Sequence, residues 1–336
     1  MVLELWGSGF NAFSQLVPDD DPFPDDIYTP ALLVTANVSL EPVFVGWSDL
    51  GLVIDGTLYW RGPTKDRTDG HDPQSTATGL FAGNQQGMIS TPHHSDVSHL
   101  AHDGTYRIAW IHSPSPATVR TTQLHRPDLS FARPTPYGLW ADGENMVQHH
   151  IETRAITQLA ANETSFTALT AEGRVFTWGD ARGVHSLGRE PTADEPAEVP
   201  AVVAALDGLV VTRIASGGGM SAALAESGDV YLWGAGKVEG LGGVPGEVAL
   251  VDLPVGEVDI VDVAVGAGHV LMLTVEGEVW AAGENENGQL GGEERAQSEW
   301  RGWKGPWKGR VMRVFSGSFA WCSLVLVERD IDHEDE

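Results

Sequence analysis

The chain has 336 residues, 42% of them hydrophobic, and its 47 Asp and Glu outnumber 20 Lys and Arg to give a net charge of −27. A chain this acidic repels phosphate backbones, so we expect no direct nucleic-acid partner and take solubility as the main role of the charge. No apolar run reaches the roughly 20 residues of a membrane span, which excludes a membrane protein of that kind.

The N-terminus lacks the basic and apolar regions of a secretory signal. The single cysteine, Cys322, excludes an internal disulfide. Both features favour a reducing compartment, so we expect a cytoplasmic or nuclear protein, or one found in both.

The chain opens on "ELWGSGFNAFSQL", residues 4–16, which has the pattern of the second half of a structural repeat. A strand ends at a Trp-Gly pair, and a turn follows. The first half of that repeat is missing upstream. The acidic stretch "DDDPFPDD", residues 19–26, then separates this opening from the next strands and is typical of a solvated connection.

Downstream, one pattern recurs in "LTAEGRVFTWG" (169–179), "LAESGDVYLWG" (224–234) and "LTVEGEVWAAG" (273–283). In each copy, Leu is followed four residues later by Gly and six residues after that by another Gly. A moderate copy lies at 43–62 and a faint one at 100–111, whereas 314–327 keeps only the first half. Fixed spacing without helical periodicity predicts a repeat of small β-sheets.

The last apolar residue of each first strand marks six repeats, spaced by 57, 59, 55, 49 and 51 residues: Val43, Leu100, Leu159, Ile214, Val263 and Val314. Because one end of the chain holds half a repeat and the other end holds its complement, the pattern predicts an all-β propeller of four-stranded antiparallel blades. Its ring is closed by N- and C-terminal strands that share one blade. We expect one domain over residues 1–327 and a disordered acidic tail over 328–336.

These residues resemble the repeat of the regulator-of-chromosome-condensation family of β-propellers. The copy that matches best consists of Gly266, His269, Leu273, Gly277, Val279, Gly283, Asn285, Gly288, Gln289, Leu290 and Gly291. The resemblance is good over 155–327 and poor over 63–154. It implies seven blades as the alternative to our count of six, with the seventh inside 63–154.

Histidines and the cysteine offer little chemistry at the sequence level. The stretch 93–102 gathers metal-ligand types in a spacing that matches no standard zinc site, which favours a histidine-rich loop: His93, His94, Asp96, His99 and His102. We interpret His149 and His150 as a surface pair and Cys322 as a buried thiol. The resemblance implies that His269 is a buried structural residue. We therefore predict no metal, no cofactor and no catalytic residue.

The stretch "SEWRGWKGPWKGR", residues 298–310, stands out because it is basic within an acidic chain. We expect it on a loop between the fifth and sixth repeats. Tryptophan and arginine are the residues most enriched in binding hot spots. The alternative is that the tryptophans pack between blades. The candidate partner-binding residues are Trp300, Arg301, Trp303, Lys304, Trp307 and Lys308. The long segment 63–96 is a second candidate.

The size and layout of the chain are similar to two groups of small stand-alone propellers in the family. The resemblance implies a non-enzymatic, monomeric scaffold or regulatory subunit that binds a small protein. One group, the α-tubulin-suppressor type, implies the CSL-type zinc protein of diphthamide synthesis and Elongator-dependent tRNA modification. The other implies a jumonji-type histone demethylase. A third hypothesis is a guanine-nucleotide exchange factor for a Ran-type small GTPase.

Overall fold

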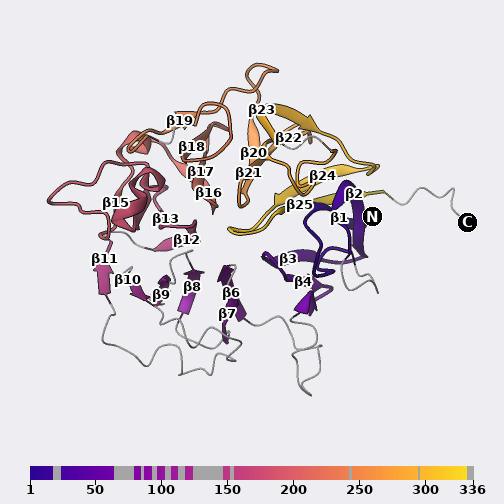
Figure 1. Cartoon of the computed structure of the whole chain (residues 1–336), viewed down its shortest axis with the longest axis horizontal. Coiled ribbons are helices and arrows are strands. Elements are labelled where there is room, and N and C mark those ends of the chain that lie inside the picture. The colour runs from indigo at the N-terminus through magenta and orange to yellow at the C-terminus, as the bar shows by residue number, and fades with distance from the viewer. Residues whose placement is uncertain are drawn as a thin grey trace, which may run out of the picture. The chain divides into compact units, whose positions relative to one another are not determined.

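The computed structural model describes residues 1–17, 24–63, 79–84, 87–92, 97–102, 107–112, 118–123, 147–151, 155–241, 244–293 and 296–330. Over these residues the strands form five four-stranded sheets, one three-stranded sheet and one two-stranded sheet (Figure 1). The chain divides into two compact units. Unit 1 comprises Met1–Ala77, Lys237–Glu239 and Leu253–Glu336, and unit 2 comprises Thr78–Gly236 and Gly240–Asp252.

Unit 1 contains three sheets, each antiparallel throughout. The first has the order β2-β1-β25-β24, and the second has the order β3-β4-β5. The third follows the chain as β20-β21-β22-β23. Their bounds are β1 Val2–Gly9, β2 Ile27–Ala36, β3 Leu40–Val45, β4 Leu50–Ile54, β5 Thr57–Arg61, β20 Ile260–Val265, β21 His269–Thr274, β22 Val279–Glu284, β23 Ala296–Trp303, β24 Arg310–Phe315 and β25 Cys322–Arg329.

Unit 2 contains the sheets β6-β7, β8-β9-β10-β11, β12-β13-β14-β15 and β16-β17-β18-β19. Two short 3-10 helices, η4 (Ala181–Leu187) and η5 (Ala204–Leu206), lie in its connections. The strand bounds are β6 Gly79–Asn84, β7 Gly87–Pro92, β8 Val97–His102, β9 Arg107–His112, β10 Thr118–Gln123, β11 Val147–His150, β12 Ile156–Ala161, β13 Ser165–Thr170, β14 Val175–Gly179, β15 Ala201–Val202, β16 Val211–Gly217, β17 Met220–Ala225, β18 Val230–Gly234 and β19 Ala249–Leu250.

All six predicted anchors lie on the first strand of a sheet, namely β3, β8, β12, β16, β20 and β24. The first strands share a feature that the sequence did not reveal. A register shift skips one position in the pairing with the second strand, two residues before the anchor, at Thr157, Thr212, Val261 and Met312. Such a bulge increases the local twist of a strand, and its recurrence shows that the repeat has one backbone geometry.

The two ends of the chain meet in one sheet, as predicted. Strand β1 pairs with β25 over eight positions, from Val2 opposite Arg329 to Gly9 opposite Cys322. Strands β2 and β24 complete the sheet on either side (Figure 1). Strand β25 runs two residues past the end expected at 327, because Glu328 pairs with Arg310. The rest of the predicted tail, 331–336, lies outside the described residues.

Buried amide side chains stabilise the turn that follows β1 in the opening motif. The Asn11 side-chain oxygen accepts from the backbone N–H of Leu16 at 2.9 Å, and Gln15 Nε2 donates to the carbonyl of Phe10 at 2.8 Å. In the repeat that resembles the family best, Asn285 accepts from Leu290 N–H at 2.7 Å in the same way. The opening is therefore the end of a repeat, as its sequence predicted.

The hydrophobic core lies between neighbouring sheets of the same unit. In unit 1, one cluster joins Leu5 of β1 and Leu324 of β25 to Leu50 and Leu52 of β4. Strand β25 is buried at six consecutive positions, Cys322 to Val327, so both of its faces are covered. In unit 2, a corresponding cluster joins β13 and β14 to β16, β17 and β18 and includes the fully buried Trp233.

The predicted count of six four-stranded blades is not confirmed. Among the described residues five sheets have four strands, and the sheet that carries Val43 has three. The segment 63–154, where an additional repeat was expected, contains the two-stranded sheet β6-β7 besides the sheet that carries Leu100. The extent of the single domain predicted over 1–327 stays a prediction.

Candidate functional site

The predicted partner-binding stretch begins on a strand, which corrects the expectation of a loop. Strand β23 is the outer strand of its sheet, and it places Arg301 opposite Ala281 and Trp303 opposite Val279 of β22. The strand was not predicted from the sequence because the stretch is rich in basic residues. Tryptophan nevertheless favours a half-buried pleated surface, and the pairing with β22 supplies the backbone hydrogen bonds. Residues 304–309 then connect β23 to β24.

The three tryptophans of the stretch pack against the protein. Trp300 and Trp303 are each only 5% exposed, and Trp303 belongs to the core cluster shared by β21, β22, β24 and β25. Trp307 is half-buried. Its ring lies edge-on to Trp303 at a centroid distance of 5.7 Å and edge-on to Trp6 of β1 at 6.4 Å. Of the two interpretations of these indoles, packing between sheets is the one that this geometry supports.

Two further features hold the Trp307 ring in place. A side chain at Gly305 would overlap that ring, so glycine is required where the connection passes the indole. On the opposite side, Trp6 Nε1 donates to Glu4 Oε2 at 2.9 Å, and Arg329 Nε donates to Glu4 Oε1 at 2.7 Å. Glu4 is 5% exposed, and these charge-assisted bonds compensate its burial.

The cations of the stretch face solvent. Arg301, Lys304, Lys308 and Arg310 are all exposed. They occupy ten residues, 301–310, that contain no Asp or Glu. We call these four residues the cationic segment. The structure thus separates the two residue types of the predicted site: the indoles form a platform, and the cations project from it. That the segment binds a partner stays a prediction.

Sequence reasoning missed Glu4, Trp6, Gly305 and Arg329 as supports of this site. They lie at both ends of the chain and inside the stretch itself, and only the pairing of β1 with β25 brings Glu4 and Trp6 near it. One signal was present in the sequence. The opening Trp6-Gly7 pair corresponds to the end of a strand in a repeat. Such a strand lies beside the end of the preceding repeat, where the stretch 298–310 was expected.

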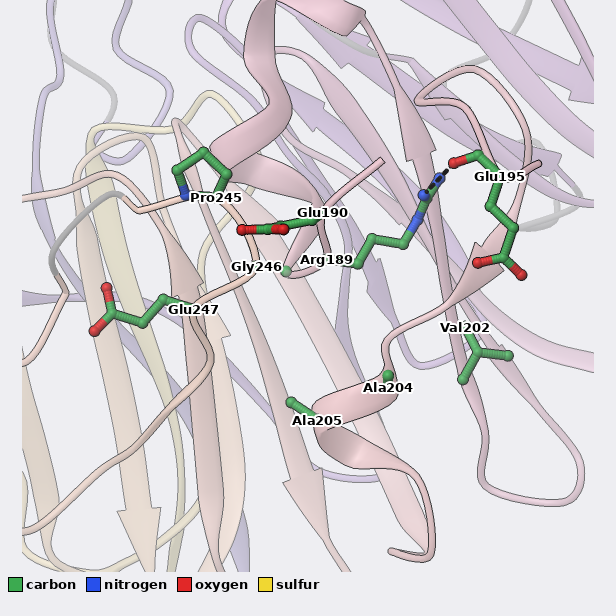
Figure 2. Close-up of a pocket in the computed structure, with 10 residues that line it drawn as sticks. Arg189, Glu190, Glu195, Val202, Ala204, Ala205, Pro245, Gly246 and Glu247 are labelled. Atoms are coloured by element: carbon green, nitrogen blue, oxygen red, sulfur yellow. Dashed lines mark hydrogen bonds between the residues drawn. The ribbon is translucent and has the colours of Figure 1, made fainter. Parts of the chain in front are cut away.

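Unit 2 contains a pocket of about 440 Å³ that no sequence motif indicated (Figure 2). The loop after η4, the residues around η5 and the connection before β19 form its walls. Glu190, Glu195 and Glu247 bring three exposed carboxylates to its lining. Carboxylates in this number would favour a cationic group over an anion.

Among the described residues that line the pocket, the single cation is Arg189, and it is engaged by the protein. It is 6% exposed and donates to the backbone carbonyl of Glu195 at 2.9 Å (Figure 2). It also donates to the carbonyls of Pro196 at 3.0 Å and Val199 at 2.8 Å. Burial lowers the pKa of its guanidinium below its usual value. Arg189 therefore fixes the loop 195–199 and is not available to bind an anion.

His269 is fully buried, as the resemblance implied. Its Nε2 lies 2.9 Å from Ser323 Oγ and 3.4 Å from Ser316 Oγ, so it bridges to the sheet that contains β24 and β25. Burial lowers its pKa from 6.5 to about 4, against a hydrogen bond with Cys322 that acts in the opposite direction. Its ring is therefore neutral at physiological pH, which suits a structural role.

Cys322 is buried at 2% exposure, and burial raises the pKa of its thiol to about 12. A thiol with such a pKa is unreactive, in agreement with the prediction of a buried, inert residue.

The structure describes only some of the residues in the histidine predictions. His93, His94 and Asp96 lie outside the described residues, as does most of the second candidate segment, 63–96. His99 and His102 belong to β8, and His149 and His150 belong to β11. Within the described part of the chain, no group of three His, Cys, Asp or Glu could hold a metal ion. None of the described helices is long and apolar enough to cross a membrane.

The fold defines an all-β propeller whose blades are mostly four-stranded and antiparallel. Two solved structures share this fold along nearly all of the chain. The crystal structure of human WBSCR16 aligns over 98% of this chain and 100% of that one, with a TM-score of 0.66 and 17% identity. Prp20p of Saccharomyces cerevisiae aligns over 98% and 92%, with a TM-score of 0.68 and 15% identity. Identities this low establish the fold alone.

The sequence comparisons find the regulator of chromosome condensation (RCC1) repeat in two stretches of this chain. Residues 172–224 and 260–289 match the sequence profiles of that repeat, which confirms the resemblance. Human RCC1 domain-containing protein 1 is 29% identical over 168 residues, or 38% of this chain and 44% of that protein. Human E3 ubiquitin-protein ligase HERC2 is 36% identical over 142 residues, or 40% of this chain and 3% of the ligase. The matched region spans less than half of each relative.

Proposed function

We propose that the protein is a non-enzymatic propeller scaffold or regulatory subunit that holds a small protein partner on residues 298–310. The observation that supports this proposal is the arrangement of the stretch. Trp303 and Trp307 are packed into unit 1, while Lys304 and Lys308 are held exposed beside them. A rigid platform with exposed charges reduces the conformational entropy lost on binding. We place the protein in the cytoplasm, the nucleus or both.

Three partners are candidates. The first is a CSL-type zinc protein of diphthamide synthesis and Elongator tRNA modification, and the second is a jumonji-type histone demethylase. The third is a Ran-type small GTPase, for which the protein would act as an exchange factor. The study of Prp20p describes its binding to Gsp1p and histones, and another structure shows Kap60 bound to yeast RCC1. Both structures are of the same yeast protein, Prp20, whose binding of proteins favours a protein partner in general over any one of the three.

The test is calorimetric titration of the full chain with each purified candidate, combined with the rate of fluorescent-nucleotide release from the GTPase. We expect one candidate to bind and the double variant Lys304→Glu, Lys308→Glu to lose that binding. The control is Arg174→Glu, Arg182→Glu, which replaces two exposed cations of unit 2. Each replacement changes the charge by −2, so both double variants move from −27 to −31.

Failure of all three candidates to bind would leave the proposal without a partner and count against it. Equal loss of binding in both double variants would show that net charge, and not this stretch, determines binding. Nucleotide release well above the intrinsic rate would replace the scaffold by an exchange factor.

A further inference from the structure

We propose that the cationic segment, Arg301, Lys304, Lys308 and Arg310, recognises a short acidic segment of a protein. This inference rests on the proposed function and names the chemistry of the partner. Four of the chain's 20 Lys and Arg fall within these ten residues, which contain none of its 47 Asp and Glu. An isolated positive region on a molecule of net charge −27 selects for a negative group small enough to remain within it.

Lys304 and Lys308 of this segment differ from four other cations of the described chain in what they face. Arg182, Lys237, Arg313 and Arg329 each form an ion pair with a carboxylate, at distances between 2.5 and 3.4 Å. Over the same described residues, neither Lys304 nor Lys308 has an ion pair within the protein. Their charges are therefore available to carboxylates from outside.

The backbone that carries these cations is fixed from three sides. Arg301 stands on β23, which is paired with β22. Arg310 begins β24 and lies opposite Glu328 of β25. Between them, the connection is held by Trp307, whose ring contacts Trp303 from one sheet and Trp6 from the other. A partner therefore meets preorganised charges and does not have to order a loop, which improves affinity at a given number of contacts.

The partner class follows from the surroundings of the segment. Glu299 precedes it on β23, Glu328 faces its last residue across the β24–β25 pair, and Asp330 follows β25. A nucleic acid carries a charge on every nucleotide and would extend over these carboxylates, which repel it. A protein segment can confine its Asp and Glu to a few residues and continue with neutral ones. Two arginines further suit carboxylates because a guanidinium binds them through two parallel bonds.

The experiment uses the full chain and a fluorescent peptide of alternating Glu and Gly, with a Gln–Gly peptide of equal length as the neutral control. Binding is measured by anisotropy at about 20 mM and about 200 mM salt, because exposed charges are screened strongly between these limits. We expect Lys304→Glu, Lys308→Glu to weaken peptide binding by at least about tenfold at low salt, which corresponds to about 1.4 kcal/mol. The control Arg174→Glu, Arg182→Glu should change it by less than about threefold, or about 0.6 kcal/mol.

Melting temperatures verify that both variants are folded, since exposed charges contribute little to stability. The inference is overturned if the wild-type chain does not bind the acidic peptide, if the neutral peptide binds equally well, or if both variants lose binding equally. Tighter binding of a single-stranded oligonucleotide of the same charge would assign the segment to nucleic acid. In each of these cases, the proposed function is still tested independently by the titrations with the candidate protein partners.

Discussion

The sheets β16–β19 and β20–β23 have the same structure in their first three strands and differ in the fourth. In both, the first strand carries a bulge two residues before its anchor, and the third has a glycine with positive φ at or next to its last residue, Gly234 or Gly283. The outer strand has two residues in β19 and eight in β23. Leu250 of β19 is 50% exposed, whereas Trp303 of β23 is 5% exposed. The repeat therefore determines the inner strands, and the outer strand is where the blades specialise.

The largest expected effect tests this difference directly. Replacing Trp303 by Ala should lower the free energy of unfolding by about 3–5 kcal/mol, because a buried indole is lost from a packed core. The matched change Leu250→Ala should cost less than about 0.5 kcal/mol, because that side chain is half exposed. Urea unfolding of both variants measures the contrast. A loss below about 1 kcal/mol for Trp303→Ala would mean that β23 is no more integrated than β19.

The second test uses a position that is titratable in one sheet and apolar in the other. His269 pairs with Gly283, and Met220 pairs with Gly234 at the corresponding place. Because burial lowers the pKa of folded His269 from 6.5 to about 4, the unfolded chain binds the proton first as pH falls. The contribution of neutral His269 to the free energy of unfolding is therefore fully present above pH 6.5 and is lost as the pH falls from 6.5 to 4.

At pH 5 this linkage should destabilise the wild-type chain by about 2 kcal/mol relative to pH 7. The variant His269→Met should lack this component, since methionine does not titrate. Comparing urea unfolding at the two pH values in both proteins cancels the contribution of the many carboxylates. Equal pH dependence in wild type and variant would show that His269 is not protonated more readily on unfolding.

A smaller effect concerns the connection that follows β23. We expect Trp307→Ala to cost about 2 kcal/mol, less than Trp303→Ala, because its ring is half-buried between Trp6 and Trp303. Binding of the acidic peptide should weaken as well, since the cations lose their support. If Trp307→Ala changes neither stability nor binding, the indole does not hold the connection. The conservative variant Trp307→Phe should retain most of both properties.

The smallest effect involves the acidic residues that follow Asp330. The segment 331–336 carries four Asp and Glu, and the strand that precedes it pairs Glu328 with Arg310. A chain that ends at Asp330 should bind the acidic peptide about two- to threefold more tightly at low salt, because four negative charges are removed from the chain. Its melting temperature should not change. Weaker binding by the shortened chain would contradict a purely electrostatic contribution.

The sequence alone determined the repeat and its phase. The spacing of Leu and Gly located the first strands, and the half repeats at the two ends predicted that β1 and β25 share a sheet. These features are local or periodic, because a hairpin needs Gly at fixed positions and a strand needs alternation over a few residues. The buried state of Cys322 was accessible for the same reason, since it lies within an apolar strand, whereas that of His269 was implied by the family resemblance.

Only the tertiary structure decided how the candidate site is built. The stretch 298–310 reads as a basic loop until β23 pairs with β22, and nothing in its sequence shows that Trp303 points into a core. Glu4 and Trp6 come from the opposite end of the chain and reach the site only because β1 pairs with β25. Whether an indole supports a surface or forms it depends on what packs against it. That is a property of contacts between distant segments, which a local pattern of residues does not encode.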